Sequence, residues 1–508
     1  MNLHTIKKAA LGVMLSGSLL ACSKSMLQED LYSQPGSPNL TGPNGAALLT
    51  NGVYGYVQYF SYFGGNNWLL NNEANTDEFF CNWGGTPATN WGGEQNFINF
   101  DPSHSMVQAN WDNLYKLIAQ CNTVLTQFSN LTDAASIQNL AQARFWRAYA
   151  YEKLYFVFGP VPLLKGTEDV SNGIARATDA DMQSFIESEL KAVENILPST
   201  YNSADYGRPT KWAVKAFLAR YYANVKNWAQ ASAYAKDVIT NGGFGLQGNY
   251  QDIFSQNGNN EVILAVNHIA QSNRGNKYVA LSMNATVASA LNISGVSASD
   301  GYGMSTPFFY SFATTDKRVT PYNAATGKGI AISGILYNSN GTPAFGTVAN
   351  PQTVEAAISR VITCKWPIVM NVPNGEDAPL NVPLLRLGET YLTYAEAQNE
   401  LGNLGEAVTY INLIRARAGL GVTGANSQTT MRDSILQERG WELYHEGYRR
   451  EDLLRAGKQK FMQKVSAKYA FYFNGNTMPW ATDTTRVYQP IPANALLLNP
   501  LLKQNKGY

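Results

Sequence analysis

Three pairs of helical segments constrain the fold of this chain more than any other feature. In 107–129 and 134–158, and again in about 212–224 and 228–240, apolar residues recur three and four positions apart, as in amphipathic helices. A third pair lies in 388–421, where a Leu-Gly turn separates two helical stretches. Alanines at the helix contact and a short turn are typical of tetratricopeptide-type repeats, which form scaffolds and carry no chemistry of their own. An all-α dominated fold of helical hairpin repeats is therefore predicted.

Two long segments of different composition separate the helical pairs. Residues 36–106 and about 245–380 are rich in Gly, Asn, Ser, Thr and aromatic residues, and their apolar periodicity is weak. Loops of this length are uncommon in a compact domain unless they bind something. We therefore expect a single domain over 39–508, in which ligand-binding loops and minor β-hairpins occupy about 54–106 and 245–380.

The N-terminus has the pattern of an export signal. Two lysines precede an apolar stretch over 9–21, which is too short to span a bilayer as a stable helix. The stretch leads into LLAC, which resembles the lipobox at which bacterial signal peptides are cut before a cysteine that is then lipidated. This predicts a signal peptide over 1–21, a lipidated Cys22 that anchors the protein to a membrane, and a polar tether over 22–38. The alternative is an ordinary signal peptide followed by an unrelated cysteine.

The charge balance and the motifs argue against several classes of function. The chain has 38 basic and 37 acidic residues, so its net charge of +1 gives no field that would attract nucleic acid or an anionic membrane. It contains no G-x-S-x-G elbow, no H-E-x-x-H motif and no Walker-type phosphate loop, and its four histidines are scattered. We therefore predict no enzyme, no cofactor, no metal site and no nucleic-acid partner. Two glycosidase carboxylates need no such motif, so the sequence leaves that one enzymatic alternative open.

Charged residues at helical spacing have a structural interpretation. Glu438, Glu442 and Glu446 lie four residues apart. One-turn spacing interleaved with arginines is typical of a buried ion-pair network rather than of catalytic acids. The same interpretation applies to the other charged residues that stand near them or in similar helical settings: Arg439, Arg449, Arg450, Arg144 and Arg147.

Three cysteines remain beyond the signal region, namely Cys81, Cys121 and Cys364. Their spacing fits no zinc motif, and an odd number cannot all pair with one another. A bridge between Cys81 and Cys121 is one alternative, and buried free thiols are the favoured one.

The segment NWGGTPATNWGG at 82–93 sets two tryptophans among glycines. Glycine at this density excludes a helix, and no alternation of a half-buried strand is present, so the segment is predicted to be a loop. Aromatic rings on a loop either fill the core beneath it or form an exposed platform. A sugar needs such a flat apolar surface together with planar amides or carboxylates that match its hydroxyls. The stretch 71–97 supplies both, and its candidate ligand-binding residues are Trp83, Trp91, Asn75, Asp77, Asn82, Asn90 and Glu94.

A second group of candidates lies in the mid-chain insertion. It comprises Arg274, Tyr278 and Tyr302, and the glycines that flank Tyr302 are typical of an exposed ring. We expect these three residues to complete the site begun by 71–97. The phenylalanines of TPFFYSF at 306–312, in contrast, follow a proline that starts a short helix, and they are predicted to lie in the core.

Five blocks of sequence, in a fixed order, carry a resemblance that covers nearly the whole chain. They are ARFWRAYAYEKLYFVFGPVPLL (143–164), GRPTKWAVKAFLARYYA (207–223), PLLRLGETYLTYAEAQNELGNLGEAVTYINLIRARAGL (383–420), ILQERGWELYHEGYRREDLLRAGK (435–458) and QPIPANALLLNPLLKQNKGY (489–508). Together they resemble the SusD/RagB family of outer-membrane nutrient-uptake lipoproteins of Bacteroidetes.

The resemblance implies a mostly α-helical fold of tetratricopeptide-like hairpins whose long loops build a ligand site. It implies a surface-exposed, lipid-anchored protein of the outer membrane that captures starch-like or other oligosaccharides without catalysis and delivers them to a SusC-like TonB-dependent transporter. Family members often place ligand-contacting aromatics and an acidic residue in the loop after the first long helix, where this chain has NTDEF. TTDKR at 314–318 resembles a block of the family, and that resemblance implies structural roles for its Asp and Arg. The balanced charge favours a neutral glycan. The alternative is an adaptor or transporter-lid subunit that binds no sugar, with its loop tryptophans buried.

Overall fold

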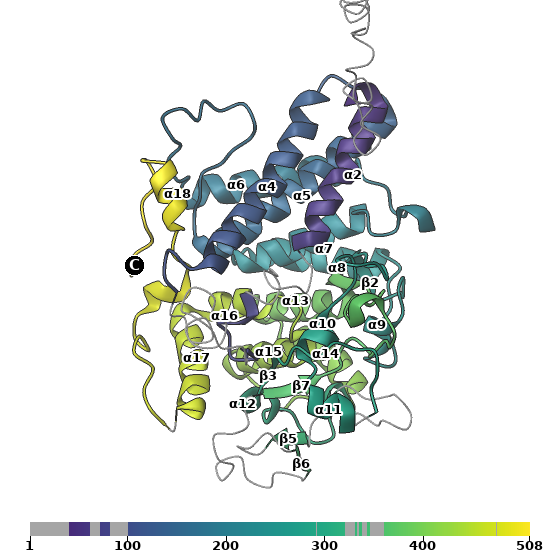
Figure 1. The fold of residues 1–508 in the computed structure, drawn as a ribbon, viewed down its shortest axis with the longest axis vertical. Coiled ribbons are helices and arrows are strands. Elements are labelled where there is room, and N and C mark those ends of the chain that lie inside the picture. The colour runs from purple at the N-terminus through teal and green to yellow at the C-terminus, as the bar shows by residue number, and fades with distance from the viewer. Residues whose placement is uncertain are drawn as a thin grey trace, which may run out of the picture.

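The computed structural model describes residues 40–60, 72–81, 100–290, 292–320, 331–332, 335–337, 343–345, 360–473 and 475–508. Helices dominate this part of the chain. Those from the first half of the sequence gather at one end of the molecule, and the later helices and the small sheets lie toward the other end (Figure 1). The longer helices are α2 (Gly42–Phe60), α4 (Ser105–Gln127), α5 (Ala134–Phe158), α6 (Asp179–Val193), α7 (Lys211–Asn224), α8 (Trp228–Asn241), α13 (Leu387–Glu400), α14 (Leu404–Arg417), α15 (Gln428–Leu443), α16 (Arg449–Ala456) and α17 (Lys458–Tyr472).

Helices α4 and α5 form the first predicted hairpin, and local caps set its ends. The His104 ring accepts a hydrogen bond from the backbone N–H of Met106, and the Asp133 carboxylate accepts one from that of Ser136, so each helix begins at a side-chain cap. Gly159 ends α5 with φ of 73°, a conformation that favours glycine. The predicted hairpin is confirmed.

The second and third hairpins, α7–α8 and α13–α14, are also confirmed. Ala219 of α7 and Ala235 of α8 are buried against Tyr394 of α13, which joins the two hairpins. Ala395 and Ala407 are buried in the third hairpin. Small side chains therefore lie where the helices cross, as the repeat pattern requires.

Helix α2 corrects the prediction that 36–106 lacks regular structure. Its buried residues Ala46, Thr50, Val53 and Val57 are spaced four, three and four apart, which places them on one face. The glycines between them lower the helical propensity and obscured this pattern. Packing of the apolar face against α4 and α5 outweighs that propensity.

The strands form small sheets that connect distant parts of the chain. The largest described sheet has the order β1-β3-β7-β4, with antiparallel neighbours, and a second pairs β2 with β8. The strands are β1 (Phe79–Cys81), β2 (Val262–Val266), β3 (Tyr302–Ser305), β4 (Ala331–Ile332), β5 (Ile335–Tyr337), β6 (Pro343–Phe345), β7 (Arg360–Thr363) and β8 (Val382–Arg386). The short helices of this region are α9 (Asp252–Ser255), α10 (Tyr278–Ser282), α11 (Ala285–Ala290) and α12 (Thr306–Phe309), and α18 (Ala493–Leu498) lies near the C-terminus.

Helix α12 confirms the short helix predicted after Pro307. Phe308 and Phe312 are buried, and Phe309 is partly buried against the same core. The phenylalanines of this stretch therefore pack inward, as predicted.

The predicted ion-pair network is confirmed, but its pairings differ from those that the spacing suggested. Glu442 lies among three guanidinium groups, those of Arg318, Arg386 and Arg417, which come from distant segments. Side chains that are adjacent in the sequence of one helix point in different directions, so a glutamate and the arginine next to it do not meet. The ion-pair partners of the glutamates therefore come from other elements that pack against the helix. The arginines expected to pair with these glutamates act elsewhere: Arg439 pairs with Asp452, Arg449 with Asp77, and Arg450 donates to the Val487 carbonyl. Arg144 and Arg147 both pair with Glu189, and Asp316 pairs with Arg318, as structural roles require.

The described residues also bear on the cysteines, on metal binding and on membrane spans. Cys81, Cys121 and Cys364 are buried, and none forms a disulfide bond there, which confirms the favoured alternative. Within the described ranges, no group of histidine, cysteine and acidic side chains has the arrangement of a metal site. None of the described helices combines the length and apolarity that a membrane span requires.

Candidate functional site

The two arms of the predicted ligand site meet in the largest sheet. Strand β1, at the end of the stretch 72–81, pairs with β3 of the mid-chain insertion, so that Phe79 lies opposite Met304 and Cys81 opposite Tyr302. The predicted loop within 82–99 comes directly after β1 in the sequence. The structure therefore brings together the two segments that the sequence assigned to one site, although they lie more than two hundred residues apart.

Asp77 holds this junction in place through a buried ion pair. Its two carboxylate oxygens accept hydrogen bonds from Nε and Nη2 of Arg449, each at 2.7 Å. Burial raises the pKa of Asp77, but the Arg449 guanidinium more than offsets this and holds the pKa below its usual value. Asp77 and the neighbouring Asn75 are buried, 8% and 1% exposed. In this conformation both side chains are interior residues, and neither is exposed in the way that a partner for sugar hydroxyls must be.

Tyr278 and Tyr302 are also interior residues. The prediction that Tyr302 presents an exposed ring is wrong, because its side chain is 0% exposed and packs 5.5 Å from the ring of Phe79. Gly303 has another role: a Cβ there would lie 2.7 Å from the Val361 carbonyl oxygen, so glycine permits the close pairing of β3 with β7. Tyr278 is buried too, and its hydroxyl lies 2.5 Å from Nδ1 of His445.

Buried titratable groups surround the base of the loop. The backbone N–H of His445 donates to Glu78 at 2.8 Å, and Lys468 donates to the carbonyl oxygens of Ala74 and Phe79. Burial raises the pKa of Glu78 to about 7 and lowers that of Lys468 to about 7. Both groups therefore change charge near neutral pH.

We expect Glu78→Gln to reduce the loss of stability that accompanies a rise in pH from 4.5 to about 7. Because burial raises the folded-state pKa of Glu78 above its ordinary 4.5, its protonated form contributes stability that is complete below pH 4.5 and lost as the pH rises through about 7. The variant removes this contribution, which amounts to at most about 1.4 kcal/mol per pH unit. Urea unfolding at several pH values between 4.5 and about 7 measures it. Lys468→Met is the opposite control, since burial lowers the pKa of Lys468 from 10.5 to about 7 and its contribution is lost as the pH falls over that higher range. Equal pH slopes for the wild type and Glu78→Gln would contradict the assignment.

The remaining loop candidates lie outside the described residues. These are Trp83, Trp91, Asn82, Asn90 and Glu94, together with the lipidation candidate Cys22. Their assignments stay predictions.

Arg274 is the sequence-predicted candidate that reaches a described cavity. It is exposed, and it lines a cavity of about 560 Å³ between α2, the segment 204–208 and the end of β2, which we call the Arg274 cavity. Gln58 of α2 fixes the backbone beside Arg274, because its side-chain amide donates hydrogen bonds to the carbonyl oxygens of Asn267 and Arg274, each at 3.1 Å. Gln58 lies near the end of α2, two residues before Phe60 and the segment that leads to the predicted loop.

Arg208 organises the opposite wall of the Arg274 cavity. Its guanidinium donates to Asp205, Gln142 and Asn51 at 2.8, 2.8 and 2.9 Å, and it lies 5.3 Å from the centre of the Tyr54 ring. The wall is therefore fixed, and its positive charge is matched by Asp205.

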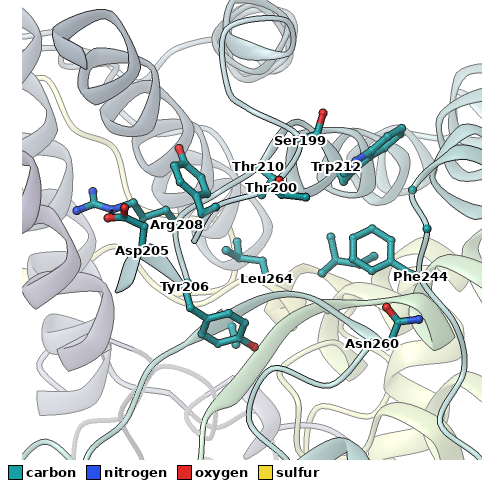
Figure 2. A pocket seen from close by; sticks show the side chains of 16 residues that line it. Ser199, Thr200, Asp205, Tyr206, Arg208, Thr210, Trp212, Phe244, Asn260 and Leu264 are labelled. Atoms are coloured by element: carbon teal, nitrogen blue, oxygen red, sulfur yellow. Dashed lines mark hydrogen bonds and ion pairs between the residues drawn. The ribbon is translucent and has the colours of Figure 1, made fainter. Parts of the chain in front are cut away.

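A second cavity, of about 300 Å³, shares the lining segment 205–208 with the Arg274 cavity (Figure 2). Its walls include the rings of Tyr201, Tyr206, Trp212 and Phe244, so we call it the aromatic cavity. In Figure 2, Leu264 of β2 lies between Tyr206 and Phe244, and Trp212 and Asn260 stand on either side of Phe244. Sequence reasoning missed this cavity, although three aromatic residues in the Pro- and Gly-containing stretch YNSADYGRPTKW (201–212) were a usable signal.

Comparisons with known proteins agree over most of the chain. Residues 202–508 match the model of the SusD family, and residues 67–223 match a model described as starch-binding associating with outer membrane. The chain is similar to the starch-binding protein SusD of Bacteroides thetaiotaomicron, with 26% identity over 86% of this chain and 84% of that protein. It is also similar to a SusD-like protein of Bacteroides ovatus, with 27% identity over 73% and 69% of the two chains.

Solved structures show the same fold. The crystal structure of a SusD homolog from Bacteroides thetaiotaomicron superposes with a TM-score of 0.76 at 20% identity, covering 94% of this chain and 99% of that one. A laminarin-binding SusD-like protein gives a TM-score of 0.73 at 22% identity, covering 91% and 99%. The family model spans more than half of the chain and the fold agrees over 94% of it, so this chain belongs to the SusD family.

Proposed function

We propose that this protein captures oligosaccharides at the cell surface, without catalysis, and delivers them to a SusC-like TonB-dependent transporter of the outer membrane. Membership of the SusD family is the observation that carries this proposal. Two relatives support the ligand class by their names, since one is a starch-binding protein and another binds laminarin. The description of the model matched by 67–223 supports the outer membrane as the location.

The proposed binding site is the loop that follows β1. Trp83 and Trp91 would form its flat apolar surface, and Asn82, Asn90 and Glu94 would bind the sugar hydroxyls. Two described features support this location, namely the ion pair of Asp77 with Arg449 and the pairing of β1 with β3, because both fix the point from which the loop starts. Arg274, exposed in the mid-chain insertion, is the described candidate for the second arm.

Affinity electrophoresis tests the function directly. The soluble chain over 23–508 is run through native gels that contain plant, microbial or host polysaccharides, and we expect at least one neutral polysaccharide to retard it. Bovine serum albumin serves as the non-binding reference. A folded protein that no polysaccharide retards would contradict capture and favour an adaptor or lid subunit of the transporter.

The proposed anchor and partner have tests of their own. Cys22→Ala should release the protein from the membrane fraction, because the acyl chains that hold it there attach to the thiol. The wild-type protein, solubilised in mild detergent, should co-purify with a TonB-dependent barrel. A variant that stays fully in the membrane fraction would contradict lipidation at Cys22.

A further inference from the structure

We infer that the aromatic cavity is an accessory binding site for a neutral pyranose unit, separate from the loop that carries Trp83 and Trp91. The ligand class rests on the proposed function, whereas the location rests on the described residues alone. At about 300 Å³ the cavity lies at the small end of ligand sites, with room for a mono- or disaccharide unit.

The side chains of the cavity supply the two surfaces that a sugar ring requires. The rings of Tyr206, Trp212 and Phe244 are each only partly buried, so they leave aromatic surface at the cavity for the CH groups of a sugar. Ile263 and Leu264 of β2 close the floor and are buried. A core-filling role alone would bury these rings more completely.

Polar groups for the hydroxyls stand at the same cavity. The Asn260 amide and the hydroxyls of Ser199 and Thr200 form no hydrogen bond with any described residue, so they are available to a ligand. The Thr210 hydroxyl is already used, since it caps α7 by accepting the N–H of Ala213. An amide offers both a donor and an acceptor, which matches the vicinal hydroxyls of a pyranose.

The charges of the cavity favour a neutral ligand. Its charged lining residues, Asp205 and Arg208, pair with each other at 2.8 Å. No unpaired charge remains among the lining residues to bind a carboxylate or sulfate. Segment 205–208 lines the Arg274 cavity as well as the aromatic cavity. One glycan chain can therefore contact both cavities across this segment.

Gly207 allows segment 205–208, which lines both cavities, to pass close to Asn267. Its φ is +92°, and a Cβ there would lie 2.7 Å from Nδ2 of Asn267, whose amide donates to the Tyr206 carbonyl oxygen. Glycine is therefore needed both for the backbone conformation and for this contact. Segment 205–208 is thus fixed by the Asn267 contact as well as by the hydrogen bonds of Arg208.

Indole NMR tests the site independently of the loop. The chain over 23–508 is labelled with ¹⁵N at the tryptophan indoles, and the Trp212 resonance is assigned with Trp212→Phe. Maltotriose, laminaritriose and cellotriose serve as neutral probes, and trigalacturonate serves as the acidic comparison. We expect a saturable shift of the Trp212 resonance with at least one neutral trisaccharide, and the same shift in the Trp83→Ala/Trp91→Ala double variant.

Two variants sharpen the test. Phe244→Ala should weaken the binding seen at Trp212 roughly two- to tenfold, the effect of losing one aromatic contact. Trp480 is a control outside the cavity, because it is also half-buried and has a cation, Arg486, 4.5 Å from its ring; Trp212 has two, Lys211 at 4.5 Å and Lys215 at 5.4 Å. Its resonance should stay fixed, and Trp480→Ala should bind like the wild type.

Several outcomes would overturn the inference. They are a Trp212 resonance that no neutral sugar moves, a shift that disappears in the double loop variant, or a preference for trigalacturonate. If Trp212 shifts while Trp83 and Trp91 stay fixed, the aromatic cavity is a sugar site and the proposed loop site is wrong. If only Trp83 or Trp91 shifts, the loop site holds and the accessory site is rejected.

Discussion

Glu442→Ala is expected to lower the free energy of unfolding by about 3–5 kcal/mol. Glu442 is fully buried, and its carboxylate lies 2.6 Å from Nη1 of Arg386 and 3.3 Å from Nη1 of Arg318, with Arg417 in contact as well. Removal of the carboxylate leaves the positive charge of the buried guanidinium groups incompletely compensated. Urea unfolding followed by circular dichroism at neutral pH measures the loss.

A surface ion pair provides the control for this prediction. Arg432 pairs with Glu400 at 2.5 Å, but the Arg432 side chain is 48% exposed. Arg432→Ala should therefore cost only about 0–1 kcal/mol. Equal losses for Glu442→Ala and Arg432→Ala would show that the buried network does not hold the fold together.

The lowered pKa of the Glu442 carboxyl predicts that the folded protein loses stability at low pH. Burial raises the pKa of Glu442, but Arg417, Arg386 and Arg318 lower it more strongly, and the result is about 2 instead of 4.5. A depressed folded-state pKa contributes stability that is present above pH 4.5 and is lost as the pH falls through about 2. The wild type should therefore lose stability over this range more steeply than Glu442→Gln.

Trp83→Ala or Trp91→Ala is expected to weaken oligosaccharide binding by about tenfold or more. A single aromatic stack contributes on the order of 1 kcal/mol, and loss of a platform also removes the orientation of neighbouring hydrogen bonds. Isothermal titration of the chain over 23–508 with the best glycan from the panel measures the change in Kd. Because the two tryptophans lie on the predicted loop and not on a helix of the scaffold, the unfolding transition should stay unchanged.

Trp480→Ala is the matched control for the loop variants as well. Its ring is half-buried and lies beside Arg486, far from β1 in the sequence. It should bind the glycan like the wild type. If neither loop substitution weakens binding and the glycan still binds, the rings fill the core beneath the loop and the site lies elsewhere.

The helical scaffold could be predicted from the sequence because its signals are local. Apolar periodicity acts over a few residues, and the predicted bounds 134–158 are those that α5 has in the structure. Helix α2 was missed for the opposite reason, since its glycines hide an apolar face that only tertiary packing makes evident.

The site could be predicted only in outline. The sequence identified both arms, but it could not show that β1 pairs with β3, and so it assigned Asp77 and Tyr302 to the surface. The pairing of β1 with β3 joins segments more than two hundred residues apart, and no local sequence pattern encodes it. The aromatic cavity was missed for the same reason, because Trp212 and Phe244 meet only after α8 has folded back.

A crystal structure of the chain over 23–508 with the best oligosaccharide bound tests the central claim most directly. The account predicts a sugar ring stacked on Trp83 or Trp91, with hydroxyls bound by the neighbouring amides of the loop after β1. A sugar held only away from this loop, with both tryptophans packed into the core, would contradict it.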